Sequence, residues 1–548
     1  MMYPKKPLAQ LIISACHDVN IETVVISPGS RNAPLTIGFS NSETIECISI
    51  VDERCAAFFA LGMAQQQQKP VAILCTSGSA LLNYYPAIAE AFYSQIPLVV
   101  ISADRPKHLI DIGDGQTIRQ ENVFENHVVY AANLRDGNLD YNIKELSTAL
   151  RLSAEKKGPV HINVPFDEPL YETTDKLGVF SMPATIEPPK NESTMNFEVF
   201  SKIWNGSKKI LILIGVNAPS SELQNVLNHL VKDSSVLIMT ETTSNLHHDN
   251  FITAIDQLIS KFTEHEFKAL QPELLITLGG MVISKRIKQF LRVYQPKKHW
   301  HIDEHRELNT FFCLSDHIKM TPASFFENLK ILSKESSYQS IWLAEKVVRN
   351  AKQHEFLKHA QYSDFVVFDK VMAVIPENSQ LQISNSSMIR YAQLFNLNKT
   401  TTVFCNRGTS GIDGSTSTAI GAAFASNRQT IFITGDISFF YDSNALWNAH
   451  IPENFRIILI NNSGGGIFKI IPGPKSTNAL PYFETPHNLT AKHLAAMFHF
   501  EYIEANNMNE VTSGLSGFFE RSLKPKILEI FTPPEINDVV LQEYFKSL

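Results

Sequence analysis

Short apolar runs alternate along this chain with longer segments in which apolar residues recur at helical spacing. In the first third, such runs occur within residues 22–31, 46–54, 71–80, 97–106 and 158–165, and helical segments such as CAAFFALGMAQQQ lie between them. Continuous apolar strands separated by helices are typical of a parallel sheet that is covered on both faces. The first third is therefore predicted to form an α/β unit.

The same alternation recurs twice more. Apolar runs predict strands within residues 208–216, 234–242, 273–280 and 297–303, and again within 380–387, 401–411, 429–438, 455–466 and 524–531. A polar, proline-bearing stretch around residues 171–196 predicts a linker, and residues 315–362 predict a helical connection. We expect three doubly wound parallel-sheet α/β domains in series, at residues 1–180, 195–340 and 355–548.

Composition narrows the class of protein. The 548 residues are 44% hydrophobic and carry a net charge of −7 without a basic run, which argues against a general nucleic-acid binder. No apolar segment is long enough to span a bilayer. The six cysteines are scattered without disulfide-like or metal-like spacing, which predicts reduced thiols and a cytoplasmic location. Neither of the common Gly-rich nucleotide-binding fingerprints is present.

Polar residues follow the apolar runs where strands should end. In IILINNSGGGIF (457–468) a strand runs into Asn462 and Gly464, and upstream another strand ends at Gly435 and Asp436. Ligands gather at the carboxyl ends of parallel strands. A carboxylate, an amide oxygen and the backbone carbonyl of Gly464 form an oxygen set that suits Mg²⁺. Taken singly, each of these residues also fits an ordinary turn.

Two further residues beside this pair fit an anionic ligand. Gly435 lets the backbone approach a diphosphate, and Ser438, near the start of the next helix, can donate a hydrogen bond to it.

The joint pattern, Gly-Asp followed about 26 residues later by Asn-Asn (436 to 462), resembles the signature of thiamine-diphosphate enzymes. The resemblance implies thiamine diphosphate with Mg²⁺ or Mn²⁺ as cofactors. It also implies a pyrimidine-binding first domain, a central domain and a diphosphate-binding last domain. In this family a glutamate activates the aminopyrimidine ring, and Glu53 in VDER has the matching position; by itself it would fit a first-turn helix acid.

The resemblance also gives roles to three large apolar residues. Ile412 matches the residue on which the cofactor bends, and Ile467 and Phe468 would line its reactive side. Ordinary core packing is the alternative for each of them. Because the family joins the first and last domains across a subunit interface, a homodimer or homotetramer is implied.

Within the superfamily the chain resembles the carboligases of menaquinone biosynthesis, which combine 2-oxoglutarate with isochorismate. The motifs that carry this likeness span most of the chain: SPGSRNAPL (27–35), SADRP (102–106), DGQTIRQ (114–120), SKR (284–286), NSSMIR (385–390) and NRGTSGIDG (406–414). Four carboxylates pass through such a site, and arginine is well suited to bind them.

Substrate residues follow motif by motif from this resemblance. Arg390, Arg407 and Ser386 would hold the 2-oxoglutarate part, with Ser386 and Arg390 on one face of a helix beginning at the NSS turn. Isochorismate would be received by Ser30, Arg31, Arg105, Gln116 and Lys285, with Gln116 also available for proton transfer. Arg286 is an alternative to Lys285, and a surface salt bridge is the alternative for each cation. The rival functions are another thiamine-diphosphate decarboxylase, an acetohydroxyacid synthase, or a non-catalytic scaffold.

Overall fold

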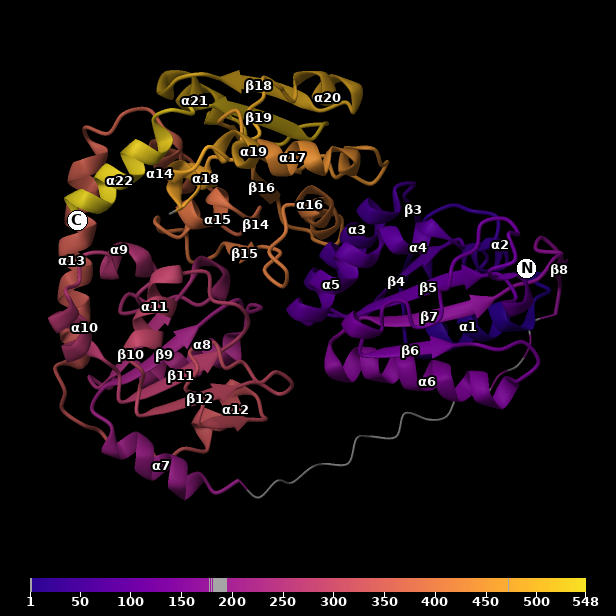
Figure 1. Ribbon diagram of the computed structural model, residues 1–548, viewed down its shortest axis with the longest axis horizontal. Coiled ribbons are helices and arrows are strands. Elements are labelled where there is room, and N and C mark those ends of the chain that lie inside the picture. Colours follow the sequence, from indigo (N-terminus) through magenta and orange to yellow (C-terminus); the bar gives the residue numbers. More distant parts are fainter. Residues whose placement is uncertain (1, 177, 179, 181–194, 472) are drawn as a thin grey trace.

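The computed structural model describes residues 2–176, 178, 180, 195–471 and 473–548. The predicted linker around residues 171–196 lies largely outside these residues. Three parallel sheets with flanking helices confirm the predicted α/β class. In Figure 1 the N-terminal unit lies on the right, the middle unit at the lower left and the C-terminal unit at the top.

The N-terminal sheet has the strand order β3-β2-β4-β5-β7-β6. Its strands are β2 (Thr23–Ile26), β3 (Glu46–Ser49), β4 (Val71–Cys75), β5 (Leu98–Asp104), β6 (Tyr130–Asn133) and β7 (Val160–Pro165). Its helices are α1 (Pro7–Asp18), α2 (Ala33–Ser40), α3 (Glu53–Gln67), α4 (Ser79–Asn83), α5 (Tyr85–Ser94) and α6 (Leu139–Lys156). A small antiparallel pair, β1 (Tyr3–Pro4) and β8 (Thr173–Thr174), closes this unit.

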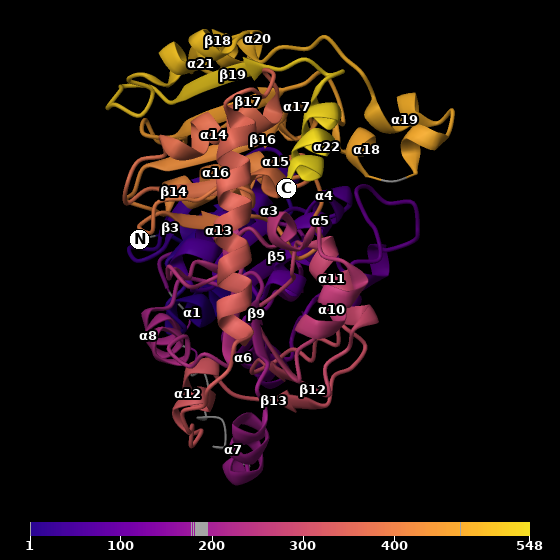
Figure 2. The ribbon, with the colours of Figure 1, turned by 90° about the vertical axis from the view of Figure 1, so that its left-hand side faces the viewer.

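The middle sheet has the order β10-β9-β11-β12-β13. Its strands are β9 (Ile210–Ile214), β10 (Val236–Thr240), β11 (Leu274–Leu278), β12 (Lys298–Ile302) and β13 (Asp316–Ile318). Its helices are α7 (Phe197–Gly206), α8 (Ser221–Leu230), α9 (Ile255–Ile259), α10 (Glu264–Leu270), α11 (Lys285–Val293) and α12 (Pro322–Glu327). The long helix α13 (Tyr338–Leu357) then runs from the middle sheet toward the C-terminal helix α22 (Asn537–Ser547) (Figure 2).

The C-terminal sheet has the order β15-β14-β16-β17-β19-β18. Its strands are β14 (Gln380–Ile383), β15 (Thr402–Phe404), β16 (Thr430–Gly435), β17 (Arg456–Asn461), β18 (Glu501–Ala505) and β19 (Lys526–Phe531). Besides α22, its helices are α14 (Asp364–Ala373), α15 (Ser387–Ala392), α16 (Ser415–Phe424), α17 (Asp436–Tyr441), α18 (Ile467–Ile470), α19 (Leu480–Glu484), α20 (Lys492–Met497) and α21 (Met508–Leu515). Taken in chain order, its strands repeat the arrangement of the N-terminal sheet, so the first and last units share one topology.

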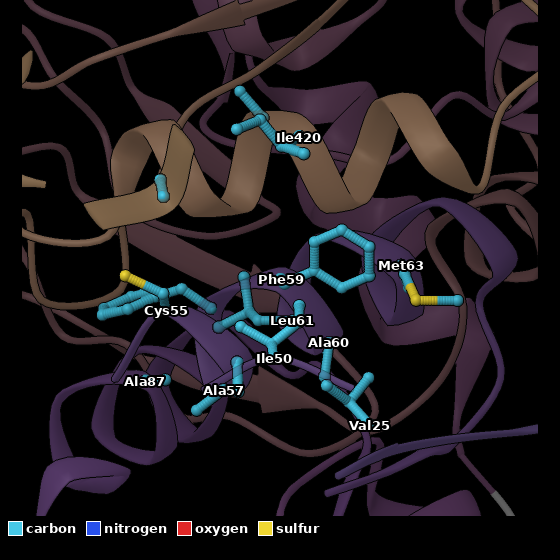
Figure 3. Close-up of a cluster of buried hydrophobic side chains, with 14 of the residues drawn as sticks. Val25, Ile50, Cys55, Ala57, Phe59, Ala60, Leu61, Met63, Ala87 and Ile420 are labelled. Carbon is cyan, nitrogen blue, oxygen red and sulfur yellow. The ribbon is translucent and has the colours of Figure 1, made fainter. Parts of the chain in front are cut away.

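Helices α3 and α16 follow equivalent strands in these two units and pack against each other (Figure 3). Glycines allow the close approach: a Cβ on Gly62 would lie 2.1 Å from the carbonyl oxygen of Thr418, and one on Gly421 would lie 2.0 Å from that of Phe59. The buried carboxylate of Asp442 accepts hydrogen bonds from Ser417 and lies 3.7 Å from Arg54 of α3. The first and last units are therefore joined within one chain by an extensive apolar core.

All six cysteines are free thiols, as the sequence predicts. Among the described residues, no helix combines the length and the apolar character that crossing a membrane requires. The sheets lie inside the predicted domain ranges, whose exact limits stay a prediction.

Candidate active site

The predicted pair of strand ends comes together in the C-terminal unit. Strands β16 and β17 are parallel neighbours, with Gly435 opposite Ile460. Asp436 begins α17 at the end of β16, and Asn462 follows β17 directly. The Asp436 carboxylate accepts a hydrogen bond from the backbone N–H of Gly464 at 2.9 Å. The two segments therefore meet at one edge of the sheet, as the strand pattern implies.

The side chains at this edge suit a divalent cation. Asp436 and Asn462 are buried, and in the described structure the Oδ1 atom of Asn462 has no hydrogen-bond partner. The Nδ2 group of the same amide donates to Asp364 at 2.9 Å. A buried, unpartnered amide oxygen beside a carboxylate fits a hard cation such as Mg²⁺. The backbone carbonyl of Gly464, the third predicted ligand, accepts a hydrogen bond from Gly466 at 2.9 Å and has a second lone pair.

The first asparagine of the pair has a different role from the second. Asn461 donates to Glu529 at 2.7 Å and to the carbonyl of Leu489 at 2.9 Å. The fully buried Glu529 also accepts hydrogen bonds from Thr490 and Tyr502. Asn461 therefore ties the segment around residue 490 to the sheet and leaves the predicted metal position to Asn462.

The predicted cofactor residues surround this edge. The Ser438 hydroxyl donates to the carbonyl of Ile412 at 2.8 Å, so it links α17 to the segment that carries Ile412, and its proton is not free for a diphosphate. Ile412 and Ile467 are partly exposed, and Phe468 stacks on Phe483 with ring centroids 5.4 Å apart. The nearest atoms to a Cβ built on Gly435 belong to a methionine side chain at 3.7 Å, so the backbone here stays open to approach.

A pair of arginines lies between the middle and C-terminal units. Arg407 is 7% exposed; it donates to Asn385 at 2.7 Å and lies 3.4 Å from the sulfur of Met281. Burial and the positive charge of Arg407 lower the pKa of Arg390. Among the described residues, no carboxylate lies within 4.0 Å of either guanidinium, and both Nε atoms are buried without a partner. Arg407 is buried and Arg390 is partly buried, and the charges of Asp256 and Glu241 act on Arg390 without a direct ion pair. Two neighbouring cations that lack a direct ion pair are arranged for an anionic ligand.

The prediction that Ser386 and Arg390 share one helix face is wrong. Helix α15 begins at Ser387, and Ser386 precedes it as the N-cap with φ of 70° and ψ of −127°. This conformation is unfavourable for a residue with a side chain. The strain lies directly beside the arginine pair, where a close approach of backbone to a ligand is expected.

The middle unit contributes one wall through the segment that precedes α11. Glu241 holds this segment by accepting hydrogen bonds from the backbone N–H groups of Ile283 and Ser284. Burial raises the pKa of Glu241 to about 7, although these bonds oppose the shift. The predicted Lys285 is exposed at the start of α11.

Two other cations of α11 behave differently from Lys285. The Arg286 guanidinium lies over the ring of Phe545 at 4.8 Å, which is a structural contact. Lys288 is half-buried, donates to the carbonyl of Val282 at 2.9 Å, and has its pKa lowered by burial and by the charges of Arg407 and Arg390. The SKR motif did not include Lys288. The sequence could have indicated it, because Lys288 lies three residues after Lys285 and such residues share one side of a helix.

The predicted N-terminal residues gather at the strand ends of the first sheet. Gln116 donates to the carbonyl of Ser77 at 2.7 Å, and the Ser77 hydroxyl donates to the carbonyl of Gln116 at 2.9 Å. Arg31 is buried; it donates to the carbonyl of Phe166 at 2.9 Å and pairs with Glu168 at 3.1 Å. These contacts place Arg31 and Gln116 on loops fixed to the sheet.

Two further predicted residues lie at the rim of this group. Arg105 pairs with Asp114 at 3.6 Å, and Ser30 is exposed. The loop that carries Gln116 is anchored by Gln120, whose side-chain amide accepts a hydrogen bond from the backbone of Gly78 and donates one to Asn163.

Glu53 is the first residue of α3 and is half-buried. Its carboxylate accepts a hydrogen bond from Asn83 at 3.2 Å. In the described part of the chain, no hydrogen bond or ion pair joins Glu53, Ser30, Arg31, Arg105 or Gln116 to the C-terminal site. The residues on either side of Glu53 do contact the C-terminal unit: Arg54 donates to the carbonyl of Tyr441 at 3.0 Å, and Asp52 accepts from Asn444 at 2.9 Å.

Comparison with known proteins finds three models of thiamine pyrophosphate enzymes that match successive parts of the chain. Residues 6–129 match the model "Thiamine pyrophosphate enzyme, N-terminal TPP binding domain", 202–383 match "Middle domain of thiamine pyrophosphate", and 383–530 match "Thiamine pyrophosphate enzyme, C-terminal TPP binding domain". Thiamine pyrophosphate is another name for thiamine diphosphate.

Full-length curated relatives share one name, 2-succinyl-5-enolpyruvyl-6-hydroxy-3-cyclohexene-1-carboxylate synthase. The protein from Flavobacterium psychrophilum is 57% identical, with 100% of both chains covered. That from Flavobacterium johnsoniae is 54% identical, also with 100% of both chains covered. That from Porphyromonas gingivalis is 36% identical, with 99% of this chain and 97% of its own covered.

Proposed function

The chain belongs to the thiamine pyrophosphate enzyme family, and from this premise we propose that it decarboxylates 2-oxoglutarate and joins the remaining succinyl part to isochorismate. The addition is of the 1,4 type, and its products are carbon dioxide and 2-succinyl-5-enolpyruvyl-6-hydroxy-3-cyclohexene-1-carboxylate, a precursor in menaquinone biosynthesis. The observation that carries the choice of substrate is the pair Arg390, which is partly buried, and Arg407, which is buried; neither forms an ion pair with a carboxylate among the described residues.

We assign the cofactor site to the edge formed by β16 and β17. Asp436, the Oδ1 atom of Asn462 and the carbonyl of Gly464 would hold Mg²⁺ or Mn²⁺, which in turn would hold the diphosphate group. Thiamine diphosphate supplies a nucleophilic carbon that allows a 2-oxo acid to lose carbon dioxide and then form a new carbon–carbon bond. Ile412, Ile467 and Phe468 would line its apolar surface, and Gly435 and Ser438 would lie beside the diphosphate.

The protein groups have separate tasks in this reaction. Glu53 would hold a proton against a ring nitrogen of the cofactor. Arg390 and Arg407, with the backbone at Ser386, would bind the carboxylates of 2-oxoglutarate. Isochorismate would be oriented by Arg31, Arg105, Ser30 and Lys285. The uncharged side chain of Gln116 would also contact isochorismate.

We also propose that the active form is a homodimer or homotetramer and that it works in the cytoplasm. This proposal rests on the family to which the chain belongs, in which the first and last domains meet across a subunit interface. The six free cysteines support a reducing compartment.

The substrate assignment is tested by carbon dioxide release. With the purified protein, thiamine diphosphate and Mg²⁺, 2-oxoglutarate alone is expected to release carbon dioxide slowly, and added isochorismate is expected to accelerate release and yield the coupled product. Turnover of pyruvate in place of 2-oxoglutarate, or release that ignores isochorismate, would support the rival decarboxylase or acetohydroxyacid synthase.

Replacing Arg407 with methionine is expected to lower kcat/KM for 2-oxoglutarate by about 10- to 100-fold, because a charge-assisted hydrogen bond contributes about 1.5–3 kcal/mol. Steady-state kinetics at saturating isochorismate measure this change, and calorimetry with the cofactor should show unchanged affinity. The exposed Arg521, replaced in the same way, is the control. An unchanged kcat/KM for 2-oxoglutarate would remove Arg407 from the substrate site.

A further inference from the structure

Asp364 is a buried carboxylate that the sequence motifs did not include. It begins α14 and is 1% exposed. Among the described residues, no lysine, arginine or histidine lies within ion-pair distance of it. Its Oδ1 atom accepts from the hydroxyl of Thr532 at 2.6 Å, and its Oδ2 atom accepts from Nδ2 of Asn462 at 2.9 Å. A buried charge without a cation is costly, so its retention needs a physical reason.

The contact with Asn462 determines how that amide is oriented. The two ends of an amide are nearly equal in size, so only hydrogen bonding selects which end faces which side. A carboxylate accepts and cannot donate, so the NH₂ end must face Asp364. The Oδ1 end then faces the opposite side, where it is buried without a partner in the described structure.

The second negative charge of this edge is Asp436. It lies close enough that its charge acts on Asp364, while its own carboxylate accepts from Gly464. Two carboxylates lie around one amide, with one histidine beside them, His487, whose Nε2 is 3.4 Å from Asp436. Such an acidic edge suits a divalent cation.

We propose that Asp364 is a positioning residue for the divalent cation: it fixes the Asn462 amide so that Oδ1 faces the metal, and it places a negative charge behind this ligand. The inference rests on the metal site of the proposed function. Partners that orient a metal ligand commonly contribute 10- to 100-fold to metal affinity.

The test measures Mn²⁺ binding without turnover. Free Mn²⁺ is followed by electron paramagnetic resonance with purified protein and thiamine diphosphate, in the absence of substrate. Asp364→Asn keeps the size of the side chain but removes the charge and lets the Asn462 amide turn over. Its Mn²⁺ affinity is expected to fall about 10- to 100-fold.

A reciprocal exchange separates orientation from simple loss of stability. In Asn462→Asp alone, two carboxylates face each other, and Mn²⁺ binding is expected to weaken. In the double variant Asp364→Asn with Asn462→Asp, the amide at 364 donates to the carboxylate at 462, so the hydrogen bond is restored in the opposite direction. Its Mn²⁺ affinity is expected to recover above that of both single variants. If Asp364→Asn does not fold, the comparison of Asn462→Asp with the double variant still tests the inference, because a higher Mn²⁺ affinity is expected in the double variant.

Asp442→Asn is the matched control, because Asp442 is also fully buried and bonded to a hydroxyl, at the contact of α3 with α16. It is expected to leave Mn²⁺ affinity unchanged even if it lowers the melting temperature. Wild-type affinity in Asp364→Asn, an equal loss in Asp442→Asn, or no recovery in the double variant would overturn the inference. Failure of the wild-type protein to bind Mn²⁺ with the cofactor would instead refute the proposed metal site.

Discussion

Replacing Glu53 with glutamine is expected to lower kcat by about 10²- to 10⁴-fold, the range for loss of a positioned proton-transfer group. Glutamine has the same length and can still accept the hydrogen bond from Asn83, but its amide cannot hold and release a proton at the cofactor. The affinity for thiamine diphosphate should therefore change little. Stopped-flow measurement of carbon dioxide release gives the rate, and calorimetry gives the affinity.

The matched control is Glu46→Gln, an exposed acid at the start of β3, the strand that precedes α3. It is expected to behave as the wild type in both measurements. A Glu53→Gln variant whose kcat stays within about threefold of the wild type would contradict a proton-transfer role, since that role requires at least 10²-fold.

Replacing Asp436 with alanine is expected to abolish cofactor binding and turnover together. The change removes the only charged side chain among the proposed metal ligands, so the loss of Mn²⁺ affinity should exceed the 10- to 100-fold typical of groups that merely orient a ligand. Chelation of the wild-type enzyme should produce the same loss, reversed by Mg²⁺ or Mn²⁺. Calorimetry with the cofactor and metal titration of activity measure both effects.

The exposed Glu453, in the turn before β17, provides the control for charge alone, and Glu453→Ala should bind the metal normally. Cofactor binding by Asp436→Ala at wild-type strength, or full activity of the wild type after chelation, would contradict the assignment of the metal site.

The two inactive variants also test the subunit arrangement. If each site combines Glu53 of one subunit with Asp436 of another, a mixed dimer of Glu53→Gln and Asp436→Ala contains one intact site and one doubly altered site. An equal mixture, dissociated and reassembled at random, should then recover about one quarter of wild-type activity. Sites contained within single chains would give no recovery, because every site would carry one substitution.

The local sequence pattern was sufficient to predict much of the C-terminal site. The apolar runs ending at Gly435 and Asn461 predicted neighbouring parallel strands, and the carboxyl ends of such strands necessarily share one edge of the sheet. Asp436 and Asn462 therefore meet for a reason visible in the sequence. The structure also separates the two asparagines, because only Asn461 reaches Glu529.

Other features depended on contacts between distant segments. Ser386 was placed on a helix by spacing, but the chain turns there with a positive φ, which no periodicity encodes. Lys285 was chosen by motif, whereas the pKa of Lys288 is lowered by its burial, and charges distant in sequence, among them Glu241 and Arg407, also act on it. The connection of Glu53 to the cofactor stays a prediction, since no described hydrogen bond or ion pair runs from its carboxylate to Asp436 or Asn462.

By itself, the sequence determined the α/β class, the parallel sheets and the oxygen donors at one strand edge, because apolar periodicity and strand-end residues act over a few positions. Only the tertiary structure decided that Asp364 orients Asn462, that two arginines lie together without a direct ion pair, and that α3 packs on α16 through glycines. These are long-range contacts, and their energies depend on burial and on neighbours that are adjacent only after the chain has folded.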